Sequence, residues 1–341
     1  MPLASLTTVA REWGRIGVLG FGGPPAHVAL LRDLTVKRRA WIDTREFEDA
    51  FAACSLLPGP ASTQLAIFTA MRVAGRTGAV VGGLAFILPG LIAVLAIAAV
   101  SLSSEPPAWI AGFGAGAAAA VVAVVAQAGI ALIDPRRGLV YVVAGTAGAV
   151  FLGPYVVAVL LLCGLASLGR YTLQSTVWPA LVWLSIKVGA LSYGGGYVII
   201  PLMREDASAW MSPQAFANAV AYGQITPGPV VHTVAFVGYG AAGLGGGLVA
   251  AAIAFAPSFA FVLIGGPHFE RLRGSKHVRA FLDGAGPAAA GAILGAAVPL
   301  LDSFEHAWQW VVLALAGVAL LRIAPIWVLV AGGVAGVATT L

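Results

Sequence analysis

Two short motifs that interrupt apolar segments are the parts of this chain best suited to chemistry. Residues 22–25 read Gly-Gly-Pro-Pro, with His27 close behind, and residues 58–60 read Pro-Gly-Pro. Proline suits the first turn of a helix because it lacks an N–H group, and glycine lets the backbone turn sharply beside a ligand. Each motif is expected to end one half-helix and to start another, whose unpaired N–H groups and dipole favour an anion.

Both motifs recur in the second half of the chain. Residues 15–23 (RIGVLGFGG) return as residues 187–195 (KVGALSYGG), and the Pro-Gly-Pro turn returns at residues 227–229. Trp41 and Phe47 have counterparts in Trp210 and Phe216. Matched interruptions of apolar segments in two halves are typical of secondary transporters, where they indicate the binding site. We therefore divide the chain into repeats at residues 1–172 and 173–341.

The composition requires a membrane. Of 341 residues 60% are hydrophobic and only 10% are charged, and apolar segments long enough to cross a bilayer recur along the whole chain. The net charge of +5 is interpreted as loop charge and not as a nucleic-acid surface. Cys54 and Cys163 are interpreted as small core residues, and no metal site, cofactor or signal peptide is predicted.

Loop charge sets the expected topology, because basic loops stay in the cytoplasm. Loops 32–45, 72–76, 134–138 and 267–279 are predicted to be cytoplasmic, so the protein is placed in the cytoplasmic (inner) membrane as a multi-pass protein. The segment 8–31 is expected to cross once, whereas 47–71 is expected to enter, turn at its Pro-Gly-Pro and leave on the same side. Each half then has about five membrane-spanning helices plus one re-entrant hairpin, and an odd number of crossings inverts the second half.

The predicted fold is thus an all-α integral membrane protein with two inverted-topology repeats. A rival reading lets both hairpins cross fully, which gives six crossings per half and a parallel repeat with worse charge placement. Arg15 and Lys187 occupy equivalent positions inside apolar segments, and two such cations would suit a dianion unless they snorkel to the interface. His27 either donates to an oxyanion or is a satisfied buried histidine. Proton coupling would need a histidine or one of four acids, Glu48, Asp49, Glu205 and Asp283.

The four helix breaks are expected to converge near the bilayer midplane, around a pocket bounded by residues 22–27, 58–64, 194–198 and 226–233. The substrate-binding residues predicted there are Arg15, Gly22, Gly23, His27, Pro58, Gly59, Pro60, Ser62, Thr63, Gln64, Lys187, Tyr193, Gly194, Gly195, Gly196, Thr226, Pro227, Gly228, Pro229, His232 and Thr233.

At these motifs the sequence resembles the chromate ion transporter family, in its two-domain form. The resemblance rests on residues 20–27, 57–64, 187–202 and 226–239, with Trp41, Phe47 and Trp210. It implies movement of chromate, with sulfate as a second oxyanion, across the cytoplasmic membrane, typically as efflux that confers chromate resistance. The chain departs from the family pattern at Tyr193, usually Phe, and at residues 68–71.

Three other classes of function compete with this one. An intramembrane enzyme is disfavoured because neither Gly-x-Ser-x-Gly nor His-Glu-x-x-His occurs. An anion channel would show flux without saturation, and a transporter of another small inorganic anion is the main alternative. The expected partners are a small oxyanion and the lipid bilayer, with no nucleic acid, and a homodimer is left open.

Overall fold

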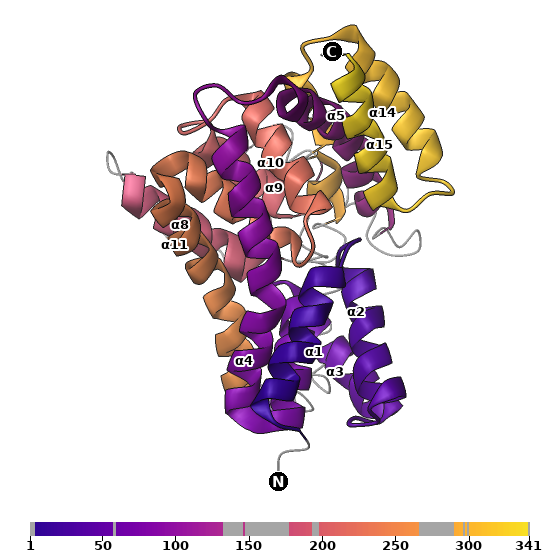
Figure 1. Ribbon diagram of the computed structural model, residues 1–341, viewed down its shortest axis with the longest axis vertical. Coiled ribbons are helices and arrows are strands. Elements are labelled where there is room, and N and C mark those ends of the chain that lie inside the picture. The colour runs from indigo at the N-terminus through magenta and orange to yellow at the C-terminus, as the bar shows by residue number, and fades with distance from the viewer. Residues whose placement is uncertain are drawn as a thin grey trace.

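The computed structural model describes residues 4–56, 59–131, 146, 177–192, 198–265, 290–295, 297–298 and 300–339. Within these ranges every regular element is a helix, which confirms the all-α prediction (Figure 1). The loops 134–138 and 267–279, as well as Pro58, Tyr193 and Gly194–Gly196, lie outside the described residues.

The helices of the first half recur in the same order in the second half. The first half contains α1 (Leu6–Leu19), α2 (Pro24–Arg32), the π-helix η1 (Asp33–Arg38), α3 (Thr44–Leu56), α4 (Ala61–Ser101) and α5 (Ala108–Ala131). The second half contains α8 (Val177–Leu191), α9 (Ile199–Ala207), α10 (Pro213–Ile225), the 3-10 turn η4 (Val230–His232) and α11 (Thr233–Gly265). The chain ends with η6 (Leu301–Ser303), α14 (Ala307–Ala319) and α15 (Pro325–Ala338).

Helices α4 and α11 each reverse direction at a glycine. Gly75 has φ 69° and Gly243 has φ 60°, backbone angles that glycine adopts without strain. Beyond the first reversal the chain packs back on itself, since a Cβ atom added to Gly78 would lie 2.7 Å from the Ala70 carbonyl oxygen. Each element is therefore a short helix followed by a longer, antiparallel one.

The longer segments of α4 and α11 form the spine of the molecule. They pack antiparallel, because Gly83 contacts Phe259 near one end and Leu95 contacts Gly247 near the other (Figure 1). Helices α1 and α8 flank this spine in matching ways. Gly17 lies against the Phe86 carbonyl and Gly189 against the Ala254 carbonyl, and both contacts are too close for a larger residue. Such small residues let membrane helices approach closely.

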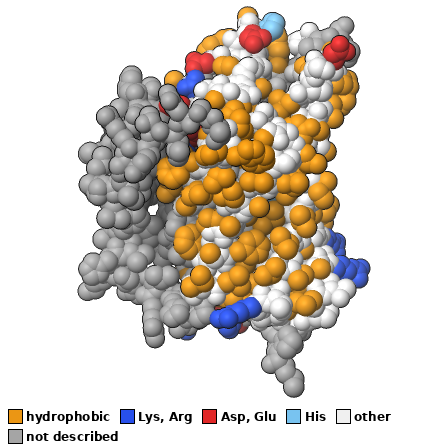
Figure 2. All heavy atoms as spheres, turned by 90° about the vertical axis from the view of Figure 1, so that its left-hand side faces the viewer, with side chains coloured by type: hydrophobic (Ala, Val, Ile, Leu, Met, Phe, Trp, Pro, Cys, Tyr) orange, Lys and Arg blue, Asp and Glu red, His pale blue; other side chains and the backbone are white. Residues whose placement is uncertain are grey.

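The surface is that of a membrane protein. Three described helices, Ala61–Ser101, Ala108–Ile130 and Val230–Gly265, are long and apolar enough to cross a bilayer. Figure 2 shows a broad apolar surface, with basic side chains at its lower end and acidic ones near its upper end. Ile92 and Ile264, on the two spine helices, are 66% and 73% exposed, as expected of side chains that face lipid.

The first apolar segment differs from its prediction. Residues 8–31 were expected to cross once, but α1 and α2 lie side by side as two helices that fold back on each other (Figure 1). Arg39, beyond α2, pairs with Glu12 of α1 at 2.6 Å, and Trp13 stacks on Trp41 at 6.2 Å. The physical reason is the turn between them, where Gly22 and Gly23 have φ 98° and 72°.

Candidate functional site

The site is built where helices begin after a break. Gly59 and Gly228 have φ 112° and 95°, so each Pro-Gly-Pro turn contains one residue in the left-handed region. Pro60 and Pro229 then take extended N-cap conformations before α4 and η4. Both α4 and η4 start without a side-chain cap, which leaves their first N–H groups for another partner. The two Pro-Gly-Pro motifs thus produce two similar helix starts.

The carbonyl of Gly20 joins the first break to the second Pro-Gly-Pro turn. Its oxygen accepts hydrogen bonds from the Gly228 N–H group at 3.0 Å and from His27 Nε2 at 2.9 Å. Because a carbonyl can only accept, His27 carries its proton on Nε2. Gly90 of α4 also packs directly against the second Pro-Gly-Pro turn, since a Cβ atom there would lie 1.9 Å from the Pro227 carbonyl oxygen.

His27 also reaches the start of α4. Its Nδ1 atom lies 3.2 Å from Ser62 Oγ, and with the proton on Nε2 the Ser62 hydroxyl is the donor. Both residues are buried, and the imidazole meets Phe86 edge-on at 5.0 Å. The residues just after the first break, the first Pro-Gly-Pro turn and the second Pro-Gly-Pro turn are therefore linked through one histidine and one carbonyl.

The first Pro-Gly-Pro turn contacts the second half of the chain. A Cβ atom added to Gly59 would lie 3.4 Å from the Gly189 carbonyl oxygen of α8 and 3.4 Å from Ser258 Oγ of α11. Gln64 Nε2 lies closer still, at 2.6 Å from the same point. Each turn thus packs against the other half of the molecule, and the described breaks gather in one region.

Several buried polar groups in this region lack a hydrogen-bond partner among the residues that the structure describes. Such groups are costly unless a ligand or water satisfies them. The atoms concerned are Thr63 Oγ1, Ser192 Oγ, Gln224 Nε2 and Ser258 Oγ. Thr63 and His232 are equivalent in the repeat, each the third residue after the second proline of its turn, and neither has any exposed surface. Each of these hydroxyl and amide groups can donate a hydrogen bond without a change in charge.

Neither of the two predicted cations is a free buried charge. Arg15 lies exposed on α1 next to Val18 and Leu19, which are themselves about half exposed. Lys187 is buried, but its ammonium group forms an ion pair with Asp206 at the end of α9. The structure therefore separates these repeat-equivalent residues and leaves neither as a free charge beside the turns.

Two other predicted residues are committed to their own helices. The Thr226 hydroxyl donates to the Tyr222 carbonyl at 2.9 Å, and the Thr233 hydroxyl donates to the Val230 carbonyl at 2.8 Å. Sequence reasoning also missed three residues that the structure brings to the turns, namely Gly20, Gly90 and Ser258. A signal existed for two of them, since Gly90 follows Pro89 and Ser258 follows Pro257 at matching places in the repeat.

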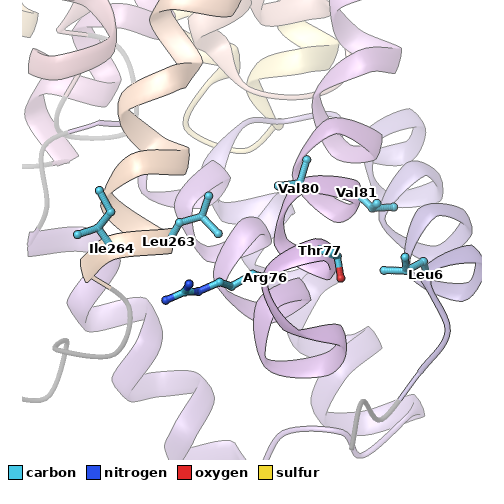
Figure 3. A pocket seen from close by; sticks show the side chains of 7 residues that line it. All are labelled: Leu6, Arg76, Thr77, Val80, Val81, Leu263 and Ile264. Atoms are coloured by element: carbon cyan, nitrogen blue, oxygen red, sulfur yellow. The ribbon is translucent and has the colours of Figure 1, made fainter.

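An open groove of about 950 Å³ lies elsewhere, at the end of the molecule where α4 reverses (Figure 3). It is lined by Leu6, Arg76, Thr77, Val80, Val81, Leu263 and Ile264. Its apolar side chains come from α1, α4 and the end of α11, far along those helices from the Pro-Gly-Pro turns. This groove is therefore distinct from the region where the breaks meet.

Comparison with known proteins identifies the family. The model of the family described as "Chromate transporter" matches residues 7–168 and again residues 179–337. A chromate transport protein of Cupriavidus metallidurans is 31% identical over 94% of this chain and 88% of its own length. One of Pseudomonas aeruginosa is 30% identical over 82% of this chain and 77% of its own.

A shorter relative matches one part of the chain. An uncharacterized transporter of Bacillus subtilis is 40% identical over 92 residues, which are 27% of this chain and 47% of that protein. No solved structure matches the chain. The double match of the family model covers nearly all residues, and it agrees with the motifs around which the helix breaks are built. This chain belongs to the chromate transporter family.

Proposed function

We propose that this protein is a secondary transporter that moves chromate, and also sulfate, across the cytoplasmic membrane, in the direction of efflux that confers chromate resistance. Family membership and the names of two relatives as chromate transport proteins support the substrate. The observation that carries the proposal is the matched pair of helix starts, together with the buried Thr63 hydroxyl, which has no partner among the described residues. Helix starts and neutral donors are what an oxyanion needs.

The proposed architecture is a pair of inverted repeats, residues 1–172 and 173–341. The antiparallel packing of the α4 and α11 spine segments supports inversion, because these segments are equivalent in the repeat. The double match of the family model supports the same two units.

Re-entrant hairpins are part of this proposal. Glu46, at the start of α3, forms an ion pair with Arg72, at the end of the short segment of α4. The two ends of the 44–73 hairpin are therefore neighbours, which favours entry and exit on one side of the bilayer. The Arg39–Glu12 pair favours the same for α1 and α2. Loops 32–45 and 72–76 then lie together at the basic, cytoplasmic end.

The test is transport by the purified chain in proteoliposomes. We expect saturable exchange of labelled chromate and sulfate, with chloride as a poor competitor, because four oxyanion oxygens match several donors and a halide does not. Leu315→Ala, an exposed position on α14, is a matched control that should transport like the parent. Flux that rises linearly with anion concentration would contradict a transporter and indicate a channel.

A further inference from the structure

The groove at the end of the molecule where α4 reverses combines apolar walls with one basic side chain. Its walls come from three helices and consist of Leu6 of α1, Val80 and Val81 of α4, and Leu263 and Ile264 of α11. Arg76 extends from the reversal toward the end of α11, and it is the one charged residue among the described residues that line the groove (Figure 3). A ligand that fits this groove has an apolar body and an anionic end.

Arg76 has no counter-charge in the part of the chain that the structure describes. Arg72, one helical turn earlier, forms an ion pair with Glu46, whereas none of the ion pairs between described residues includes Arg76. The helix is broken at Gly75, which has φ 69°, so Arg76 lies in the first turn of the longer segment of α4. The positive end of a helix dipole disfavours a cation and favours an anion. An anionic group beside Arg76 would therefore be stabilised both by the guanidinium group and by the helix start.

A line of exposed apolar side chains runs from the groove along the longer segment of α4. It consists of Val80, Leu84, Leu88 and Ile92, which recur every four residues and are between 41% and 66% exposed. Residues four apart lie on one face of a helix. From the first to the last of them the helix rises about 18 Å, which is close to one leaflet of a hydrocarbon core roughly 30 Å thick. An acyl chain that follows this face therefore ends with its headgroup near Arg76.

The second half of the chain supplies an internal comparison. Gly243 is equivalent to Gly75, so Leu244 takes the place of Arg76 at the other helix reversal. Leu244 is 57% exposed, and the half-exposed Trp178 of α8 lies beside the residue that follows it. This end of the molecule thus repeats the apolar surface without the cation. In the proposed inverted topology it meets the outer leaflet, whereas Arg76 meets the cytoplasmic leaflet, whose surface is anionic.

We infer that the groove binds one anionic phospholipid of the cytoplasmic leaflet, with its phosphate on Arg76 and one acyl chain along Val80 and Leu84. The phosphate supplies the counter-charge of Arg76, and the acyl chain covers the apolar walls, which a free phosphate ion would leave bare. Because the walls belong to both halves of the chain, the bound lipid holds the reversal of α4 to the end of α11. The site is separate from the Pro-Gly-Pro turns and does not depend on which anion is transported.

The experiment counts the lipids that remain bound to the full chain in detergent, by native mass spectrometry. Phosphatidylglycerol and phosphatidylcholine with identical acyl chains are added in equal amounts. The parent is expected to retain one phosphatidylglycerol per chain, with a preference of about fivefold over phosphatidylcholine, the factor that one basic residue contributes beside an anionic lipid. Arg76→Leu, which copies the second half of the repeat, should lose this preference, and Arg76→Lys should keep it.

Two further variants make the result decisive. Arg322→Leu removes an exposed basic residue just after α14, outside the groove, and should keep the preference. Val80→Trp fills the groove and should lower the retention of phosphatidylglycerol although Arg76 is still present, and it decides the matter should Arg76→Leu fail to fold.

Three results would overturn the inference. The first is equal retention of the two lipids by the parent, and the second is an unchanged preference in Arg76→Leu or in Val80→Trp. The third is a parent that retains no lipid and forms dimers that Val80→Trp abolishes, which would assign the groove to a second copy of the chain. Loss of chromate transport in proteoliposomes is not among them, so the lipid site and the proposed function fail independently.

Discussion

The two Pro-Gly-Pro turns are built alike but rest on different surfaces. The second turn packs against Gly20 and Gly90 by direct backbone contact, with Gly228 bonded to the Gly20 carbonyl. The repeat replaces those glycines by Ser192 and Ser258, whose buried hydroxyls have no partner among the described residues. Ser258 lies beside the first turn. The second turn is sealed by close packing, whereas a hydroxyl group without a hydrogen-bond partner among the described residues lies beside the first turn. The comparison teaches that a duplicated scaffold can hold an asymmetric site.

The sealed turn should be the more sensitive to added volume. Gly90→Ala places a methyl group 1.9 Å from the Pro227 carbonyl oxygen, so the backbone must move. We expect loss of transport and a fall in stability of about 1–3 kcal/mol, measured by thermal unfolding in detergent. Gly317→Ala is the matched control, because a Cβ atom in that helix meets nothing within 4 Å and alanine favours helices. Normal transport by Gly90→Ala would show that the turn is not sealed.

The equivalent cations Arg15 and Lys187 should respond very differently to neutralisation. Lys187→Gln leaves Asp206 without its partner in a mostly buried setting, and we expect a loss of about 1–3 kcal/mol in stability. Arg15→Gln should change stability by less than about 0.5 kcal/mol, since Arg15 is exposed. Unfolding temperatures of the two variants and of Lys187→Gln/Asp206→Asn give the test. A double variant no more stable than Lys187→Gln would deny the ion pair this role.

Removal of a buried donor that has no partner among the described residues should have opposite effects on stability and on oxyanion affinity. Thr63→Val removes a buried hydroxyl that has no partner, so the protein without anion should be as stable as the parent or slightly more stable. Oxyanion affinity should fall about tenfold, the cost of one hydrogen bond to a charged group. Thr233→Val is the control for affinity, because its hydroxyl already bonds to Val230. Unchanged affinity in Thr63→Val would place the anion elsewhere.

The smallest effect is expected from cysteines that report only on orientation. Thr77 and Gly245 are exposed, follow the two helix reversals and are equivalent in the repeat. Thr77→Cys should react in intact cells only with membrane-permeant thiol reagents, and Gly245→Cys also with impermeant ones, while both transport normally. The parent chain, which contains Cys54 and Cys163, is labelled in parallel. Labelling of both variants from the same side would contradict inverted repeats.

The sequence by itself determined the membrane setting, the helical class and the places where helices break. Apolar length and the low charge content require a bilayer, and glycine adopts without strain the positive φ angles seen at Gly22, Gly59, Gly75 and Gly228. The repeat also determined which residues start matching helices, such as Thr63 and His232. These features are local, so spacing and residue type carry them.

Only the tertiary structure decided which breaks touch and which charges are free. The segment 8–31 is long enough to cross a bilayer, and the Arg39–Glu12 and Trp13–Trp41 contacts reveal that it folds back. Arg15 and Lys187 look alike in the sequence, yet one faces outward and the other pairs with Asp206. The crossed contacts of Gly59 with Ser258 and of Pro227 with Gly90 join residues more than a hundred positions apart. Such pairings depend on how the helices pack, and the sequence of one helix does not indicate which helix it will contact.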